Sequence, residues 1–161
     1  MSLAALREIQ KSNGWRAVAV ALVKDETPLP GSQDDFGTFW IEAGHRMREQ
    51  IADDQLLCKV LRHMLPPYHG SALKLYRGEN IERWHARELG LSWTTKLEVA
   101  RMFASGLNAV RTGGVLLEGT FAQNAIISGP NGHSRYLDEE QFTVDPSLAK
   151  GVRQLETFPP A

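Results

Sequence analysis

Cysteine is nearly absent from the sequence, because Cys58 is the only one in 161 residues. No intramolecular disulfide can form, and the apolar run 56–61 around Cys58 favours a small buried residue over a nucleophile. No apolar stretch approaches the roughly 20 residues that a membrane-spanning helix needs. The segment 2–10 is interrupted by Arg7 and Glu8, unlike the core of a signal peptide. We therefore expect a cytoplasmic protein with no membrane partner.

An excess of charge of either sign is also missing, since the formal net charge is −1. This balance lacks the electrostatic signature of proteins that bind nucleic acid or anionic membranes. Hydrophobic residues make up 42% of the chain, which is enough for a packed core. The length suits a single domain spanning residues 1–161.

The common motifs of cofactor and metal chemistry are missing as well. The sequence contains no Gly-x-Gly-x-x-Gly loop, no Walker loop and no Gly-x-Ser-x-Gly elbow. Its histidines are dispersed, without a His-x-x-x-His or Cys-x-x-Cys pair, so a zinc site has little support. We expect no metal.

The N-terminal part, residues 1–70, is predicted to be helical. In order, its elements are a helix over 2–12, an apolar segment over 15–23 that suits either a helix or a buried strand, a loop over 25–35, and amphipathic helices over 36–51 and 57–65. Asp53 and Asp54 are candidates to cap the last helix, and Pro66-Pro67 should end it.

The C-terminal part, residues 71–161, is predicted to be rich in strands. Strands are expected over 72–76, 91–94, 115–121, 125–128, 142–144 and 152–158. Arg77-Gly78 should form a turn after the first strand, and Thr95 should open a helix through Ala104 as part of a Thr-x-x-Glu capping box. Because these strands are too closely spaced for regular βαβ units, the chain is predicted to be an α+β protein.

Three segments place polar side chains at the ends of apolar strands: 75–78, 91–95 and 138–146. Taken alone, they suit a solvated turn, a helix cap and a charged loop. Their order, however, resembles the Arg…Ser…Glu series of the ADP-ribosyltransferase superfamily. The resemblance covers residues 73–146, and its most specific part is the sequence 90–95 followed by 99–104.

The resemblance implies a fold in which N-terminal helices pack on a split, mainly antiparallel β-sandwich. It also implies that the strand-rich part binds NAD, as a substrate, without a metal. Catalysis is implied for Arg77, Ser92 and Glu140, and NAD binding for Tyr76, Arg77, Gly78, Ser92, Trp93 and Thr94.

The chemistry of NAD cleavage explains these residue types. The planar fork of Arg77 suits phosphate or ribose oxygens, and Gly78 would let the ligand approach the backbone closely. Ser92 would bind the ribose or orient the glutamate, with Thr94 assisting. Tyr76 and Trp93 are candidates for stacking on nicotinamide or adenine. Glu140 would stabilise the positive charge that develops at the anomeric carbon as the glycosidic bond breaks.

A second register stays open at the glutamate. If Asp138-Glu139-Glu140 matches the family's Glu-x-Glu, Glu140 is catalytic; if Glu139-Glu140-Gln141 matches it, Gln141 takes that place. Successive strand residues point to opposite faces, so both cannot face the ligand. We favour Glu140, because glutamine carries no negative charge. The segment 128–137 just before it corresponds to an acceptor-recognition loop in the family.

The resulting hypothesis is a mono-ADP-ribosyltransferase that cleaves NAD and transfers ADP-ribose to an unidentified macromolecular or small-molecule acceptor, as a toxin or effector. One alternative is an NAD glycohydrolase toxin, in which water is the acceptor. Another is a catalytically silent domain that binds a nucleotide or a protein partner. The N-terminal helices would suit a neutralising protein, but their apolar stripes equally suit internal packing.

Overall fold

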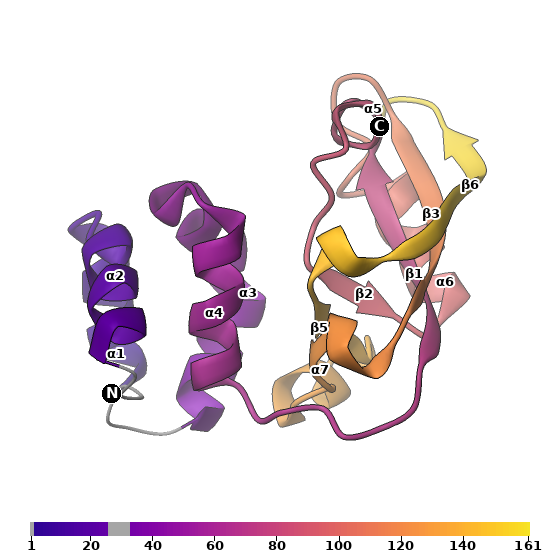
Figure 1. Ribbon diagram of the computed structural model, residues 1–161. Coiled ribbons are helices and arrows are strands. Elements are labelled where there is room, and N and C mark those ends of the chain that lie inside the picture. Colours follow the sequence, from indigo (N-terminus) through magenta and orange to yellow (C-terminus); the bar gives the residue numbers. More distant parts are fainter. Residues whose placement is uncertain (1, 26–32) are drawn as a thin grey trace. The chain divides into compact units, whose positions relative to one another are not determined.

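The computed structural model describes residues 2–25 and 33–161, and they divide into two compact units (Figure 1). The helical unit comprises the described residues up to Pro67 together with Asn131–Ser134. The strand-rich unit comprises Tyr68–Pro130 and Arg135–Ala161. The predicted α+β class is confirmed.

The helical unit contains α1 (Leu3–Lys11), α2 (Trp15–Asp25), α3 (Gln33–Ile51) and α4 (Asp54–Met64). The undecided segment 15–23 is thus a helix. Asp53 caps α4 as predicted, since its side chain accepts a hydrogen bond from the Leu56 N–H. The predicted loop over 25–35 is wrong at its ends, where Asp25 closes α2 and α3 begins at Gln33. Residues 26–32 lie outside the described part.

The apolar stripes of these helices form the core of the helical unit, and Cys58 is buried there as predicted. Trp15 and Phe39 meet with ring centroids 5.5 Å apart. The other large, fully buried side chains of this unit are Leu6, Phe36, Met47, Ile51, Leu57 and Leu61. Among the described helices, none is both long and apolar enough to cross a membrane.

The strand-rich unit contains one six-stranded sheet with the strand order β4-β5-β2-β1-β3-β6 and antiparallel neighbours throughout. The strands are β1 (Leu73–Asn80), β2 (Ser92–Thr94), β3 (Gly114–Phe121), β4 (Ile126–Ser128), β5 (Gln141–Val144) and β6 (Lys150–Phe158). All six were predicted; five differ from the prediction by at most two residues at an end, whereas β1 ends four residues later than predicted. The helical elements of this unit are α5 (Ile81–Ala86), α6 (Leu97–Ser105) and the short 3-10 turns Gln123–Ala125 and Pro146–Leu148. The α7 helix (Gly132–Tyr136) begins within Asn131–Ser134 of the helical unit and ends in the strand-rich unit. The α5 and α7 helices were not predicted.

Strand β1 continues past the predicted turn at Arg77-Gly78. Arg77 lies opposite Leu117 of β3 and Gly78 opposite Leu116, so both belong to the ladder. The turn prediction is wrong because Asn80, rather than Gly78, ends the strand and caps α5 with its side chain.

The sheet has two different faces. The core face carries Leu75, Trp93, Leu117, Phe121 and Val144, which pack together in one buried cluster. The opposite face, here the α6 face, packs against α6 through the cluster that Ala100, Ala104 and Leu116 form with the half-buried Tyr76. Because strand residues alternate between faces, each polar residue of the three motif segments that lies within a strand can be assigned to one of them.

The predicted capping box at Thr95 is wrong, although the helix itself is present. The α6 helix begins at Leu97 with Lys96 as its N-cap, and no side chain caps it. The Thr94 hydroxyl instead accepts a hydrogen bond from the Lys96 N–H at 3.0 Å. The hydroxyl of Thr95 is directed to Glu140, at 3.2 Å from its carboxylate.

Candidate functional site

The three motif segments lie on neighbouring strands, in the order β5-β2-β1. Tyr76 of β1 lies opposite Thr94 of β2, and Thr94 lies opposite Gln141 of β5. Residues 18 and 47 positions apart in the sequence are therefore next to one another in the sheet. Sequence order alone did not fix this adjacency.

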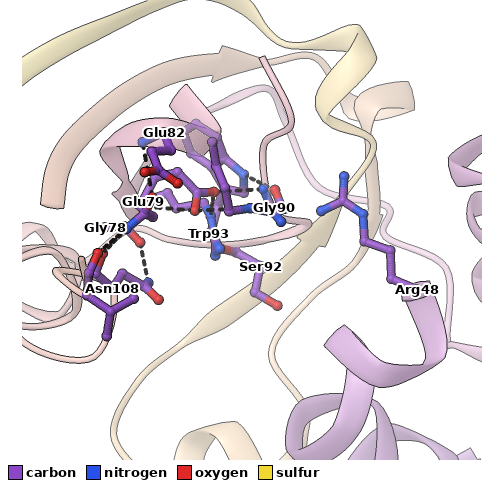
Figure 2. A network of polar contacts seen from close by, with 12 residues as sticks. Arg48, Gly78, Glu79, Glu82, Gly90, Ser92, Trp93 and Asn108 are labelled. Carbon is purple, nitrogen blue, oxygen red and sulfur yellow. Dashed lines mark hydrogen bonds and ion pairs between the residues drawn. The ribbon is translucent and has the colours of Figure 1, made fainter. Parts of the chain in front are cut away.

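Arg77 is held by two contacts within the strand-rich unit. Its Nε donates to the Glu79 carboxylate at 2.6 Å, and its Nη1 donates to the Ser92 carbonyl at 2.9 Å. The Arg77 side chain therefore contacts the main chain of Ser92 and not its hydroxyl group. In Figure 2 the Ser92 side chain points away from this network. The Arg77 side chain as a whole is 19% exposed.

Glu79 is the buried centre of this network, and the sequence reasoning missed it (Figure 2). Its carboxylate accepts from Arg77, from the Asn80 N–H at 2.9 Å and from the Gly90 N–H at 2.9 Å. Arg83 lies 3.6 Å away. The available signal was Arg-x-Glu within one strand, because residues two apart share a face and opposite charges then pair.

Its partners decide the ionisation of Glu79. Burial alone would raise the pKa of the carboxyl group, but the Arg77 charge, the Arg77 hydrogen bond and the backbone N–H groups of Gly90 and Asn80 outweigh it. The net pKa lies below its ordinary value of 4.5, so Glu79 is a carboxylate at neutral pH.

The lowered pKa of Glu79 predicts a loss of stability in acid. A carboxyl group whose pKa is lower in the folded state stabilises the fold above its unfolded pKa, and this contribution disappears as the pH falls through the folded pKa. We expect the difference in unfolding free energy between the wild type and Glu79→Gln to narrow below pH 4.5. Urea unfolding between pH 7 and pH 3 measures it.

Glu118→Gln is the matched control for this experiment, because Glu118 also pairs with basic residues in the sheet, Arg153 and Lys74. Because Glu118→Gln leaves Glu79 in place, this variant should lose more of its unfolding free energy on acidification than Glu79→Gln does. A difference in unfolding free energy between the wild type and Glu79→Gln that stays constant down to pH 3 would contradict the lowered pKa of Glu79.

Ser92 and Thr94 lie on the α6 face, together with Gln141 and Thr143 of β5. The register pairs Ser92 with Thr143 and Thr94 with Gln141, and directly opposed residues share a face. Arg77 lies on the core face, because it alternates with Tyr76. The Ser92 hydroxyl and the Arg77 guanidinium therefore point to opposite faces of the sheet.

Glu140 lies just before β5, in left-handed backbone with φ of 45°. This conformation is uncommon for a residue with a side chain. Thr95 donates to its carboxylate, and the Thr94 hydroxyl donates to the Glu139 carbonyl at 2.8 Å. The threonines at the end of β2 thus contact the segment that presents Glu140.

Lys96 adds an ion pair with Asp138, which is also in left-handed backbone with φ of 57°. The hydrogen bond from Lys96 to Asp138 raises the pKa of the lysine, and the charges of Asp138 and Glu140 add to this effect against a smaller cost of burial. Three successive residues after Trp93 therefore contact Asp138, Glu139 and Glu140.

The remaining predicted NAD contacts have packing partners. Trp93 is fully buried in the core, where its Nε1 donates to the Gly90 carbonyl at 2.8 Å, so its ring has no exposed face for stacking. Tyr76 packs against the cluster under α6. At Gly78, a Cβ atom would overlap the backbone of Ala100 and Ala104, so the close approach at this glycine is to α6.

No family model, curated protein or solved structure matches the chain. Across residues 2–25 and 33–161, histidine, cysteine and acidic side chains form no group of three that could hold a metal ion.

Proposed function

We propose that this chain is a mono-ADP-ribosyltransferase with a core of the ADP-ribosyltransferase type. The observation that carries the proposal is the strand order β5-β2-β1. It places side by side the three short segments whose Arg, Ser and Glu resemble the motif series of that superfamily. The proposal brings Arg77 and Glu140 to the ligand and leaves Ser92 out, because the Ser92 hydroxyl points to the opposite face of the sheet from Arg77.

In this proposal Arg77 binds phosphate or ribose oxygens of NAD. Its contacts to Glu79 and to the Ser92 carbonyl use two of the five N–H donors of a guanidinium. Three donors are then available for charge-assisted hydrogen bonds, within the part of the chain that the structure describes. NAD is the substrate, and no metal takes part.

Glu140 stabilises the oxocarbenium-like transition state as nicotinamide leaves. Its carboxylate receives a hydrogen bond from Thr95, and the neighbouring Thr94 bond anchors Glu139, so the segment is held in place before substrate arrives. Preorganisation of this kind is what an electrostatic contribution to catalysis needs.

The acceptor of ADP-ribose is proposed to meet the segment just before Glu140. Tyr136 is 85% exposed and Leu137 44% exposed. Both lie in the stretch 128–137 that corresponds to the acceptor-recognition loop of the superfamily. Exposed apolar and aromatic groups beside a catalytic residue suit contact with a macromolecular target.

A second candidate is a nucleotide-binding domain that does not cleave NAD. It is favoured by the register that places Gln141, an uncharged side chain, opposite Thr94 and on the same face as Ser92. If the α6 face holds the ribose of NAD, the amide of Gln141 occupies the position at which a catalytic glutamate would lie.

Incubation of the purified chain with NAD labelled in its adenosine half tests these proposals. We expect nicotinamide release, with the label on a macromolecule when cell extract is added. Nicotinamide together with free ADP-ribose, even in extract, would identify a glycohydrolase. Binding of NAD without nicotinamide release would favour the second candidate, and the absence of both binding and release would refute the NAD proposal.

A further inference from the structure

Glu79 is a buried charge that the proposed chemistry does not use directly. It is 1% exposed, and both of its oxygens are engaged: Oε1 by the Asn80 N–H, with Arg83 nearby, and Oε2 by Arg77 and the Gly90 N–H. A carboxylate so placed has no surface for a ligand. Its effect on a ligand must pass through a more exposed partner. Of the two arginines beside it, Arg77, with a side chain 19% exposed, donates a hydrogen bond to it, whereas Arg83, 42% exposed, lies 3.6 Å away.

Gly90 forms the second side of the same arrangement. A Cβ atom at Gly90 would overlap the Nη2, Cζ and Nε atoms of Arg77, so the guanidinium lies directly over this glycine. Gly90 is itself fixed on both sides, because its N–H donates to Glu79 and its carbonyl accepts from the fully buried Trp93. The close approach of Arg77 is thus a physical reason for a glycine here.

The Ser92 carbonyl completes the enclosure by accepting from Arg77 Nη1. We call this group the Arg77 socket: it consists of Glu79, Gly90 and the Ser92 carbonyl. Together they determine both the plane of the guanidinium and the edge that it presents, since bonds at Nε and Nη1 leave little rotational freedom. A charged side chain fixed in this way loses less entropy when it binds an oxyanion.

We propose that Glu79 and Gly90 are positioning residues, which hold the Arg77 guanidinium in the orientation that binds the phosphate or ribose oxygens of NAD. This inference rests on the proposed function for the identity of the ligand. The geometry of the socket itself does not depend on it.

Two substitutions disturb the socket in different ways. Glu79→Gln keeps the shape of the side chain but removes the negative charge that holds Nε. Gly90→Ala keeps Glu79 and instead displaces the guanidinium with a methyl group. Because the overlap is with the far end of a long side chain, Arg77 can move away and the fold can persist.

Calorimetry with NAD and the NMR signal of the Arg77 Nε–H group provide two independent measurements. We expect both variants to weaken NAD affinity about tenfold or more, and to move the Arg77 signal to that of a solvent-exposed arginine. Glu118→Gln is the matched control, because Glu118 lies opposite Tyr76 and therefore on the α6 face. It should leave both measurements unchanged.

A double-mutant cycle separates positioning from a general effect on the fold. In an Arg77→Ala background Gly90→Ala has no guanidinium to displace, so it should change NAD affinity less than twofold. An equal loss of affinity in both backgrounds, or full affinity in both socket variants, would overturn the inference.

The two proposals fail in distinguishable ways. A wild-type chain that does not bind NAD refutes the proposed function and the ligand assigned to the socket. A shift of the Arg77 signal in Glu79→Gln would still establish the socket in that case. An unchanged signal in this variant would overturn the socket, whether or not NAD binds.

Discussion

Gly114→Ala should destabilise the strand-rich unit by about 3 kcal/mol, the upper end of the usual cost of overpacking. Gly114 is buried at the start of β3, and a Cβ atom there would overlap the carbonyl of Ala104 in α6. The obstacle is helix backbone, which cannot turn aside as a side chain can. Relief requires α6 to move away from the sheet, with loss of packing against Leu116 and Tyr76. Urea unfolding of the wild type and of Gly114→Ala measures the difference in unfolding free energy.

Gly129→Ala is the matched control for this substitution. A Cβ atom at Gly129 would meet only side-chain atoms, of Tyr68 at 3.9 Å and Phe142 at 4.0 Å, which are ordinary contact distances. We expect a change of less than about 0.5 kcal/mol, or slight stabilisation through the unfolded state. If Gly114→Ala were as stable as Gly129→Ala, the close packing of α6 on β3 would be wrong.

The close packing of α6 on the sheet also explains why the sequence interpretation of Gly78 differs from its place in the structure. Next to an arginine, a glycine suggested room for a ligand. The structure instead places Gly78 under α6, with its carbonyl accepting from Asn108 at 2.6 Å. A single sequence cannot tell whether a glycine makes room for a ligand or for a helix, because both require the same missing Cβ atom.

The helices and strands were predictable where hydrophobic periodicity was strong. The stripes of α3 and α4 gave the right helices, because their buried faces follow regular spacing. The apolar run 115–121 gave β3, in which residues 114–117 are all buried. The short helices α5 and α7 lack such a stripe. Their existence depends on local contacts, such as the side chain of Asn80 that caps α5.

The site could be predicted only in part. The motif segments were found because polar residues at strand ends are visible in the sequence. The Arg77–Glu79 pair was predictable in principle from alternation within one strand. The role of Gly90 was not, because it depends on where the Arg77 guanidinium lies in space. The predicted capping role of Thr95, at the end of the second motif segment, was wrong, because its hydroxyl bonds to Glu140 and no side chain caps α6.

Glu140→Gln should lower the rate of nicotinamide release by at least about a hundredfold, the usual cost of removing one electrostatic stabiliser of a transition state. The substitution keeps the size of the side chain and an oxygen that can accept from Thr95, so the fold should be retained. Release of nicotinamide from NAD, followed by chromatography, measures the rate. Glu139→Gln is the matched control, because Thr94 contacts the main-chain carbonyl of Glu139 rather than its carboxylate.

The reciprocal substitution Gln141→Glu decides between the two registers at β5. Gln141 lies opposite Thr94 and shares a face with Ser92, whereas Glu140 precedes the strand in left-handed backbone. If Glu140 supplies the charge, Gln141→Glu should not increase nicotinamide release, since a second carboxylate nearby only adds repulsion. A wild-type chain that is silent and becomes active on Gln141→Glu would instead identify an NAD-binding domain in which one amide replaces the catalytic carboxylate. Near-normal release by Glu140→Gln would exclude this residue as the catalytic glutamate in either case.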